Sequence, residues 1–234
     1  MSEFFDSPEF QEAWEIFRTQ FPLAAWETVY VTVVSTFFAI VIGLPLGVLL
    51  VTGEKGGIRP LPSPLLKLLN WIINILRSVP FLILMILVIP LTRALTGTAI
   101  GTTACIVPLT AAAFPFAARL AESSLREVSP ETVEMAQSMG ASPLKIITKV
   151  LIPESKPSLI SNATIAITTV LGYSAMSGII GGGGLGKIAI NYGYYRYKYL
   201  VMIIAVVLLI IIVQLFQTVG TMLAKKTDKR LKRT

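Results

Sequence analysis

The amino-acid sequence predicts an all-α polytopic membrane protein with five transmembrane helices, an external N-terminus and a cytoplasmic C-terminus. Three observations support this prediction. Of the 234 residues, 54% are hydrophobic and only 14% are charged, whereas a soluble domain carries about 25% charged residues. The charges lie almost wholly between apolar segments, each close to the ~20 residues that a helix needs to cross ~30 Å of hydrocarbon. The connecting segments also differ sharply in how many basic residues they carry.

The apolar segments are expected to be the spans of a single transmembrane domain, residues 23–224. The segment from Thr28 to Val51 contains no charged residue, and the segment from Leu68 to Thr92 contains only Arg77. The five expected spans cover about 24–52, 68–93, 98–121, 157–180 and 199–224.

The orientation follows from lysine and arginine, which are enriched in cytoplasmic connections. Fourteen lie on one side: Lys55, Arg59, Lys67, Arg119, Arg126, Lys145, Lys149, Lys156, Lys225, Lys226, Lys229, Arg230, Lys232 and Arg233. Five lie on the other: Arg18, Arg93, Lys187, Arg196 and Lys198. The richer side is therefore predicted to be cytoplasmic, and it includes the basic tail 225–234.

Residues 1–22 are expected to form an external amphipathic helix that lies in the membrane interface. Ser7 and Pro8 are typical of a helix start. Four aromatic residues then recur at helical spacing on one face, namely Phe10, Trp14, Phe17 and Phe21. An aromatic face on a helix before the first span is typical of an interfacial anchor.

The glycine run in "IIGGGGLGKIAI", 179–190, resembles a phosphate-binding loop at Gly181, Gly186 and Lys187. Ile188 stands where that loop needs Ser or Thr, and no strand precedes the run. The run also lies toward the predicted external face. We therefore expect no nucleotide site here, and two alternatives stay open: a mobile external gate or a simple helix terminus.

The longest polar interval is predicted to form two short helices on the cytoplasmic side, within a coupling segment that covers 126–156. Ser129 and Pro130 begin the first helix, and Gly140 ends it. Ser142 and Pro143 begin the second, which Pro153 is expected to stop. The two helices are too short to span a membrane and too well capped for a linker, so they are expected to form a docking surface.

Two stretches inside the spans carry the polar residues that are candidates for lining a translocation pathway or its gate. In "NILRSVP" these are Asn74, Arg77 and Ser78; in "GYSAMSG" they are Tyr173, Ser174 and Met176. A charge that faces lipid costs several kcal/mol, so Arg77 is expected to face protein, a cavity or the headgroups. The alternative is that all six are ordinary packing residues.

The composition argues against catalysis by this chain. It has no His and a single Cys, Cys105, so a zinc or haem site is not expected. No bound cofactor is predicted either. Acidic residues such as Glu27 and Glu122 reach only the ends of the spans, which disfavours an ion-coupled secondary transporter without removing that alternative.

The coupling segment resembles a motif of bacterial ABC importer permeases, E-A-A-x-x-x-G followed after nine residues by I-x-L-P. Glu134, Ala136, Gly140 and Pro153 match at the correct spacing, and Met135 replaces the first alanine. The resemblance implies that this segment docks on an ATPase. The residues to which it assigns that role are Glu131, Glu134, Ala136, Met139, Gly140, Ala141, Pro143 and Pro153.

Further motifs from about 44 to 194 resemble the methionine importer permease family. They are "NILRSVPFLIL", "IVPLTAAAFPFAAR", "MGASPLKIITKVLIPE", "GYSAMSG" and "GGGLG". The resemblance implies an ABC type I importer permease fold and a homodimer in the bacterial cell membrane. Its implied partners are two ATPase subunits, which hold ATP and Mg, and a lipid-anchored extracellular binding protein. The implied substrate is L- or D-methionine, with another amino acid or small polar solute as the alternative.

Overall fold

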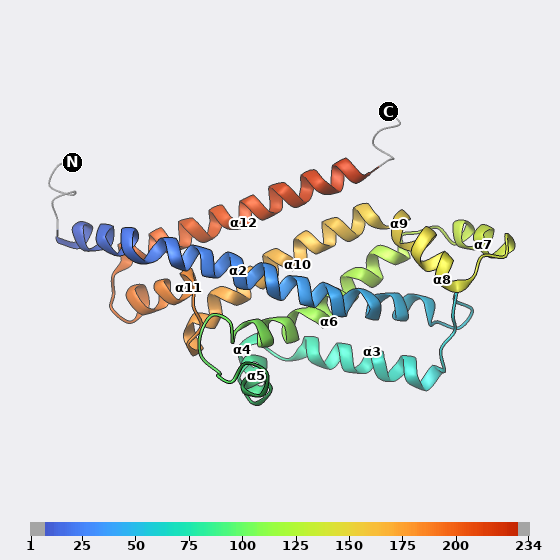
Figure 1. The fold of residues 1–234 in the computed structure, drawn as a ribbon, viewed down its shortest axis with the longest axis horizontal. Helices are drawn as coiled ribbons and strands as arrows, with labels where there is room; N and C mark the ends of the chain where they lie inside the picture. Colours follow the sequence, from blue (N-terminus) through green and yellow to red (C-terminus); the bar gives the residue numbers. More distant parts are fainter. Residues whose placement is uncertain (1–7, 229–234) are drawn as a thin grey trace. The chain divides into compact units, whose positions relative to one another are not determined.

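The computed structural model describes residues 8–228, and these residues form helices and connecting turns without a strand (Figure 1). The first half contains α2 (Pro8–Thr52), α3 (Ser63–Ser78), α4 (Phe81–Leu87), α5 (Ile89–Thr96) and α6 (Ile106–Arg126). Next come α7 (Pro130–Ser138), α8 (Pro143–Ile146), the π-helical η1 (Ile147–Leu151) and α9 (Ile152–Glu154). The rest is α10 (Lys156–Ser177), the 3-10 helix η2 (Gly178–Ile180), α11 (Leu185–Ile188), the π-helical η3 (Ala189–Tyr194) and α12 (Tyr199–Thr227).

The chain divides into two compact units. The described residues of the first are 8–35, 81–110 and 167–216. Those of the second are 36–80, 111–166 and 217–228. The glycine run and "GYSAMSG" belong to the first unit, whereas the coupling segment and "NILRSVP" belong to the second.

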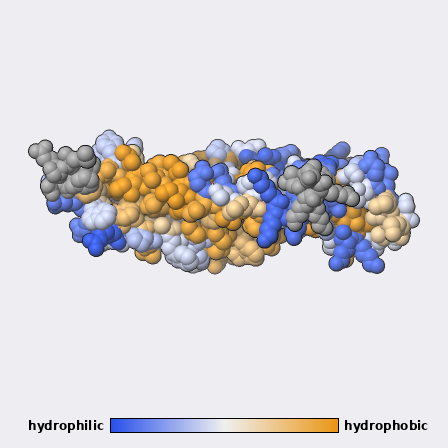
Figure 2. All heavy atoms as spheres, turned by 90° about the horizontal axis from the view of Figure 1, so that it is seen from above, coloured by the Kyte–Doolittle hydropathy of each residue, from blue (hydrophilic) through white to orange (hydrophobic). Residues whose placement is uncertain are grey.

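Three helical segments among the described residues are long and apolar enough to cross a membrane: Pro8–Thr52, Lys156–Ile180 and Tyr199–Thr227. A fourth is added if α3 and α4 together make one broken span. The fourth and fifth expected spans agree closely with two of these segments. Residues on α12 such as Ile203, Val206 and Ile210 are exposed, and Figure 2 shows a broad hydrophobic area among hydrophilic ones on the face that it presents. Exposed apolar area of this extent requires lipid or a partner.

The expected second and third spans differ from the structure at their boundaries. The second, 68–93, is interrupted because Val79 is extended, with ψ of 125°. Pro80 explains this, since proline lacks an N–H and disfavours the helical conformation in the residue before it. The third, 98–121, begins late, because residues 101–105 form turns and bends and α6 starts at Ile106.

The N-terminal helix is not separate from the first span, because α2 runs without a break from Pro8 to Thr52. Residues 1–7, including the expected start at Ser7, lie outside the described residues. Within the first unit, Ile16 and Phe21 are buried in a core that α11 and α12 complete with Leu185 and Val201. This segment therefore packs on its own chain, and its placement in the membrane interface stays a prediction.

In the second unit, α2 and α6 cross at very short range. A Cβ added at Gly43 would lie 2.8 Å from the Cβ of Ala117, and one added at Gly47 would lie 2.7 Å from that of Ala121. Small residues on both helices permit this approach. Next to the crossing, Leu50 of α2 and Ala118 of α6 are buried together with Ile73 of α3, so the three helices share one core.

Candidate functional site

The coupling segment forms the expected pair of helices around Gly140, and the turn is a complete Schellman motif. The Gly140 N–H donates to the Gln137 carbonyl at 2.9 Å, and the Ala141 N–H donates to the Ala136 carbonyl at 3.1 Å. Gly140 has φ of +73°, a conformation that costs other residues roughly 1–2 kcal/mol. The end of α7 is therefore set by backbone geometry at one glycine.

The second short helix does not stop at Pro153. After α8, the backbone passes through the π-turn η1 and continues as α9, which contains Pro153 near its start. Since proline cannot donate the usual hydrogen bond to the carbonyl four residues earlier, a π-turn just before it accommodates the ring. Buried Ile146 and Leu151 anchor this run in the second unit.

The helices α7 and α8 and the Gly140 turn between them, residues 130–146, form an elbow that exposes large apolar side chains beside charged ones. Met135, Met139 and Leu144 are 60%, 81% and 70% exposed. Most other residues assigned to docking are exposed as well, namely Glu131, Glu134, Gly140, Pro143 and Pro153, whereas Ala136 and Ala141 are half-buried. Exposed methionine and leucine on a short polar segment are typical of a surface that a partner covers.

A cleft of about 510 Å³ lies behind α7. Val133, Glu134 and Gln137 of α7 line it, together with the turn at Gly56 and the C-terminal end of α6 at Arg126. The exposed face of α7 and the α6 terminus thus meet around one hollow.

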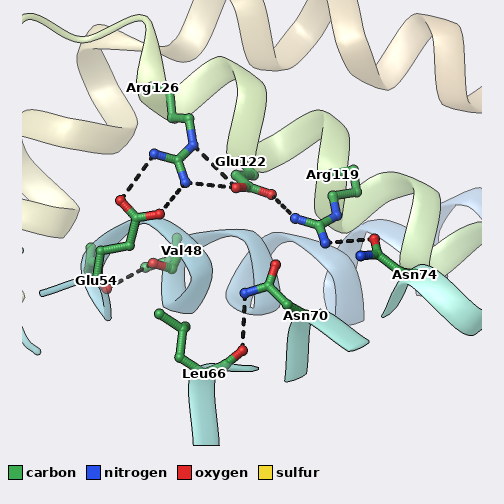
Figure 3. A network of polar contacts seen from close by, with 9 residues as sticks. Val48, Glu54, Leu66, Asn70, Asn74, Arg119, Glu122 and Arg126 are labelled. Atoms are coloured by element: carbon green, nitrogen blue, oxygen red, sulfur yellow. Dashed lines mark hydrogen bonds and ion pairs between the residues drawn. The ribbon is translucent and has the colours of Figure 1, made fainter. Parts of the chain in front are cut away.

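A chain of ion pairs and hydrogen bonds fastens the end of α6 to the rest of the second unit (Figure 3). Arg126 donates to the two carboxylate oxygens of Glu54 at 2.6 and 3.2 Å, and to Glu122 at 2.8 Å. Arg119 donates to Glu122 at 2.6 Å and to the side-chain oxygen of Asn74 at 2.8 Å. Arg126 beside Glu54 holds the pKa of that carboxyl below its usual value, and the two carboxylates raise the pKa of Arg126.

A second polar cluster joins α6 to α10. The Asn162 amide donates to the buried Ser124 hydroxyl at 2.7 Å and to the Leu120 carbonyl at 3.1 Å. The Ser158 hydroxyl donates to Glu127 at 2.8 Å and lies 3.1 Å from the Ser124 hydroxyl. The coupling segment begins at the end of α6 and ends at the start of α10. Hydrogen bonds therefore join the two helices close to both ends of this segment.

The pathway candidates of "NILRSVP" occupy one end of α3. Asn74, Arg77 and Ser78 lie on one helix face, because they are three and four residues apart, and all three are exposed. Ser78 donates to the Asn74 carbonyl at 2.8 Å. Of the three, Asn74 also contacts α6 through Arg119.

The candidates of "GYSAMSG" lie near the end of α10 in the first unit. The Tyr173 ring stacks on Phe81 with centroids 4.4 Å apart, and Met176 is 40% exposed. Ser174 is buried, and its hydroxyl donates to the Leu171 carbonyl at 2.7 Å. Tyr173 and Met176 are therefore the members of this group with surface available to a solute.

The glycine run is tightly packed and internally bonded. Glu27 accepts from the Gly184 N–H at 2.8 Å and from the Thr102 hydroxyl at 2.7 Å, while Thr28 accepts from the Leu185 N–H at 2.9 Å. A Cβ at Gly184 would lie 2.6 Å from the Thr28 hydroxyl oxygen. The N–H groups of Gly184 and Leu185 already donate to side chains of α2, so they are not available to bind a phosphate. The run ends where α11 begins.

Sequence reasoning missed Leu144 and the ion network. Leu144 lies between the motif positions Gly140 and Pro153, and only its apolar character in a polar interval pointed to it. Arg126 and Glu54 lie 72 residues apart in sequence, so no local pattern joined them.

Comparison with known proteins defines the class. The family described as "Binding-protein-dependent transport system inner membrane component" matches residues 39–231. The chain belongs to this family, whose members are permease subunits of ABC transporters.

Individual relatives show which members of this family the chain resembles. "Probable D-methionine transport system permease protein MetI" of Vibrio cholerae serotype O1 is 49% identical over 207 residues, 88% of this chain and 92% of the relative. The protein of the same name in Pasteurella multocida is 47% identical over 208 residues, 89% and 95% of the two chains. A solved structure titled as inward facing conformations of the MetNI methionine ABC transporter superimposes with a TM-score of 0.89 at 44% identity, covering 92% of this chain and 99% of that one. The predicted resemblance to the methionine permease family is confirmed.

Proposed function

We propose that this chain is the permease subunit through which methionine, in its L- or D-form, crosses a bacterial inner membrane. ATP is hydrolysed on separate subunits, and this chain is not an enzyme. The observation that carries the proposal is the kinship to D-methionine permeases across 88% of the chain. The exposed Met135, Met139 and Leu144 of the elbow support it, because large exposed apolar side chains of this kind need a partner.

The proposed assembly contains two copies of this chain, two ATPase subunits and an external lipid-anchored binding protein. The relative of known structure is part of a MetNI methionine ABC transporter. Few helices are available in one chain to enclose an amino-acid pathway, so a two-fold pair is the expected arrangement. The ATPase is proposed to cover Met135, Met139 and Leu144.

The contacts that connect the elbow to α6 and α10 suggest how closure of the ATPase could move the membrane helices. The polar cluster around Ser124 joins α6 and α10, and the ion network joins α6 to α3 and to the turn after α2. When the ATPase subunits close, a force on α7 would pass to α6 and α10 together. The helices would then rock as a rigid body between two packings.

The proposed topology retains five spans with the N-terminus outside. In it, α3 with α4 forms a broken second span, and α6 forms the third. The charges of α6 lie only in its C-terminal part, from Arg119 onward, where a cytoplasmic end would place them in water or headgroups. Tyr173 and Met176 are proposed to line the pathway, with Asn74, Arg77 and Ser78 near its cytoplasmic side.

Two alternatives remain distinct from this proposal. An importer of another amino acid or small polar solute would share the fold and the elbow, because such sites do not fix the substrate. An ion-coupled secondary transporter would move solute without any ATPase.

Uptake into proteoliposomes separates these possibilities. Labelled L- and D-methionine would be supplied with the binding protein outside, with and without the ATPase subunits and ATP inside. The proposal predicts uptake only with ATP, and competition by unlabelled methionine but not by unrelated amino acids. Uptake driven by a proton or sodium gradient in vesicles that lack the ATPase would refute it.

A further inference from the structure

A cavity of about 350 Å³ in the first unit lies beside the glycine run, apart from the coupling segment and the pathway candidates. It is lined by α2, the start of α11 and η3, and it contains charged residues of both signs: Glu27, Lys187 and Arg196. Its volume lies within the usual range for small-molecule sites, about 300–1,000 Å³.

The negative group of the cavity is a fixed carboxylate without a cation. Glu27 is half-buried, and its two oxygens accept from the Thr102 hydroxyl and the Gly184 N–H. These bonds hold the carboxylate in place, but they leave its charge uncompensated. No ion pair among residues 8–228 includes Glu27.

The two basic side chains of the cavity, Lys187 and Arg196, also lack a partner of opposite charge among the described residues. The nearby Lys198, by contrast, pairs with Glu12. The Arg196 guanidinium lies over the Tyr192 ring, 4.9 Å from its centroid. The Tyr192 hydroxyl in turn accepts from the Gln20 amide at 2.7 Å, so the ring that supports Arg196 is itself held.

Separated charges of opposite sign around one cavity match a zwitterion. We propose that this cavity binds a free α-amino acid, with the ligand's ammonium at Glu27 and its carboxylate at Lys187 and Arg196. Leu23, which also lines the cavity, supplies apolar contact for the ligand's side chain. The assignment of methionine as this ligand rests on the proposed function; the preference for a zwitterion rests on the cavity alone.

The test is equilibrium binding of labelled L-methionine to the purified full chain in lipid nanodiscs, without ATPase or binding protein. Two competitors each lack one charge: methionine methyl ester has no carboxylate, and methylthiobutanoate has no ammonium. The wild-type chain should bind methionine about ten- to a hundredfold more tightly than either, as expected for the loss of one charge-assisted bond. Equal binding of all three, or no binding of methionine, would overturn the proposal.

Variants assign the charges. Glu27→Gln should lower methionine affinity about tenfold or more while leaving methylthiobutanoate unchanged. Lys187→Met and Arg196→Met should lower methionine affinity and leave the methyl ester unchanged. Both side chains are exposed, so unchanged binding of the methyl ester also reports a folded protein. Arg18→Met is the matched control, because Arg18 is exposed on α2 and does not line the cavity; it should bind as wild type. If Lys187→Met and Arg196→Met also bind methionine as wild type, the site is wrong.

ATP-driven uptake separates the two proposals. Uptake without a zwitterion preference at this cavity would overturn the site and leave the proposed function. A confirmed zwitterion site in a chain that shows no ATP-dependent uptake would do the reverse.

Discussion

At the scale of single residues, Gly140 sets the direction of the elbow through its backbone rather than through space. Its φ is +73°, and a Cβ added there would meet nothing of this chain within 4 Å. Asn tolerates this left-handed conformation far better than a β-branched residue does. Comparing Asn with a β-branched residue at position 140 therefore tests two possible requirements for glycine. One is its left-handed backbone conformation, and the other is close approach of a partner.

We therefore predict that Gly140→Asn retains most ATP-driven uptake and that Gly140→Val loses most of it, with both proteins present in the membrane in normal amounts. Uptake in proteoliposomes, normalised to inserted protein, is the measurement. Equal loss in both variants would instead show that the ATPase approaches Gly140 too closely for any side chain.

Glu54 gives a pH-dependent prediction. Its pKa is lowered from 4.5, chiefly by the hydrogen bond from Arg126. A carboxyl whose folded pKa is lowered stabilises the fold above its ordinary pKa, and this contribution disappears as the pH falls through the lowered value. Because the pair is largely exposed, its contribution is about 0.2–1 kcal/mol.

Glu54→Gln should therefore lower the thermal unfolding temperature at pH 7 by up to about 4 °C. The difference from wild type should shrink as the pH falls below 4.5 and vanish once it is below the lowered pKa of Glu54. Thermal scans of the purified chain in detergent measure it. Glu15→Gln, an exposed position in α2, serves as the control and should match wild type throughout. A difference that persisted in acid would mean that the ion pair is not the source.

At the scale of elements, the crossing of α2 and α6 depends on two glycines. Added Cβ atoms at Gly43 and Gly47 would meet the α6 backbone at 2.9 and 2.8 Å as well as its alanines, and backbone cannot rotate away as a side chain can. The helices would have to separate, at an overpacking cost of about 1–3 kcal/mol.

Gly47→Ala should accordingly lower the unfolding temperature by several degrees. Gly172→Ala is the matched control, since Gly172 lies within α10 and a Cβ there meets nothing within 4 Å. That control should be neutral or slightly stabilising through helix propensity. The same loss in both variants would contradict the close crossing.

The elements show how far sequence alone reaches. Long apolar runs predicted the starts of α10 and α12 within one residue and their ends within three, because length and hydropathy are properties of the run itself. Pro80 and Pro153 were harder, since a proline can break, kink or locally widen a helix depending on its packing. The continuity of α2 was missed because the aromatic face of residues 10–21 is typical equally of a membrane interface and of a protein core.

In the candidate site too, features set by local sequence could be predicted, and contacts between distant segments could not. Gly140 and the capping positions follow from local backbone chemistry and were predictable. The Arg126–Glu54 pair and the α6–α10 cluster join distant segments, so only the fold brings them together. Ser174 is buried in this chain and its hydroxyl donates to the Leu171 carbonyl, a local bond that composition does not show. Its place at a pathway stays a prediction.

At the scale of the whole molecule, the proposed topology places the elbow in the cytoplasm and the loop at Tyr195 outside. In a Cys105→Ala background, cysteines at Ser142 and Tyr195 report these positions. A membrane-impermeant maleimide should label Tyr195→Cys but not Ser142→Cys in spheroplasts, and the pattern should reverse in inverted vesicles. Labelling of both positions from one side would reject five spans, because both side chains are exposed in the structure.

The central claim is that a separate ATPase docks on the exposed apolar side chains of the elbow and drives transport through them. One measurement tests this claim most directly. ATP hydrolysis and methionine uptake would be recorded together in proteoliposomes that contain wild type, Met139→Leu or Met139→Glu. Because Met139 is 81% exposed in this chain, neither change should harm the fold. We predict that Met139→Leu transports normally and that Met139→Glu loses at least about tenfold of its uptake, as expected for burying an unpaired charge in an interface. Wild-type uptake by Met139→Glu, or uptake by any of the three without the ATPase, would contradict the account.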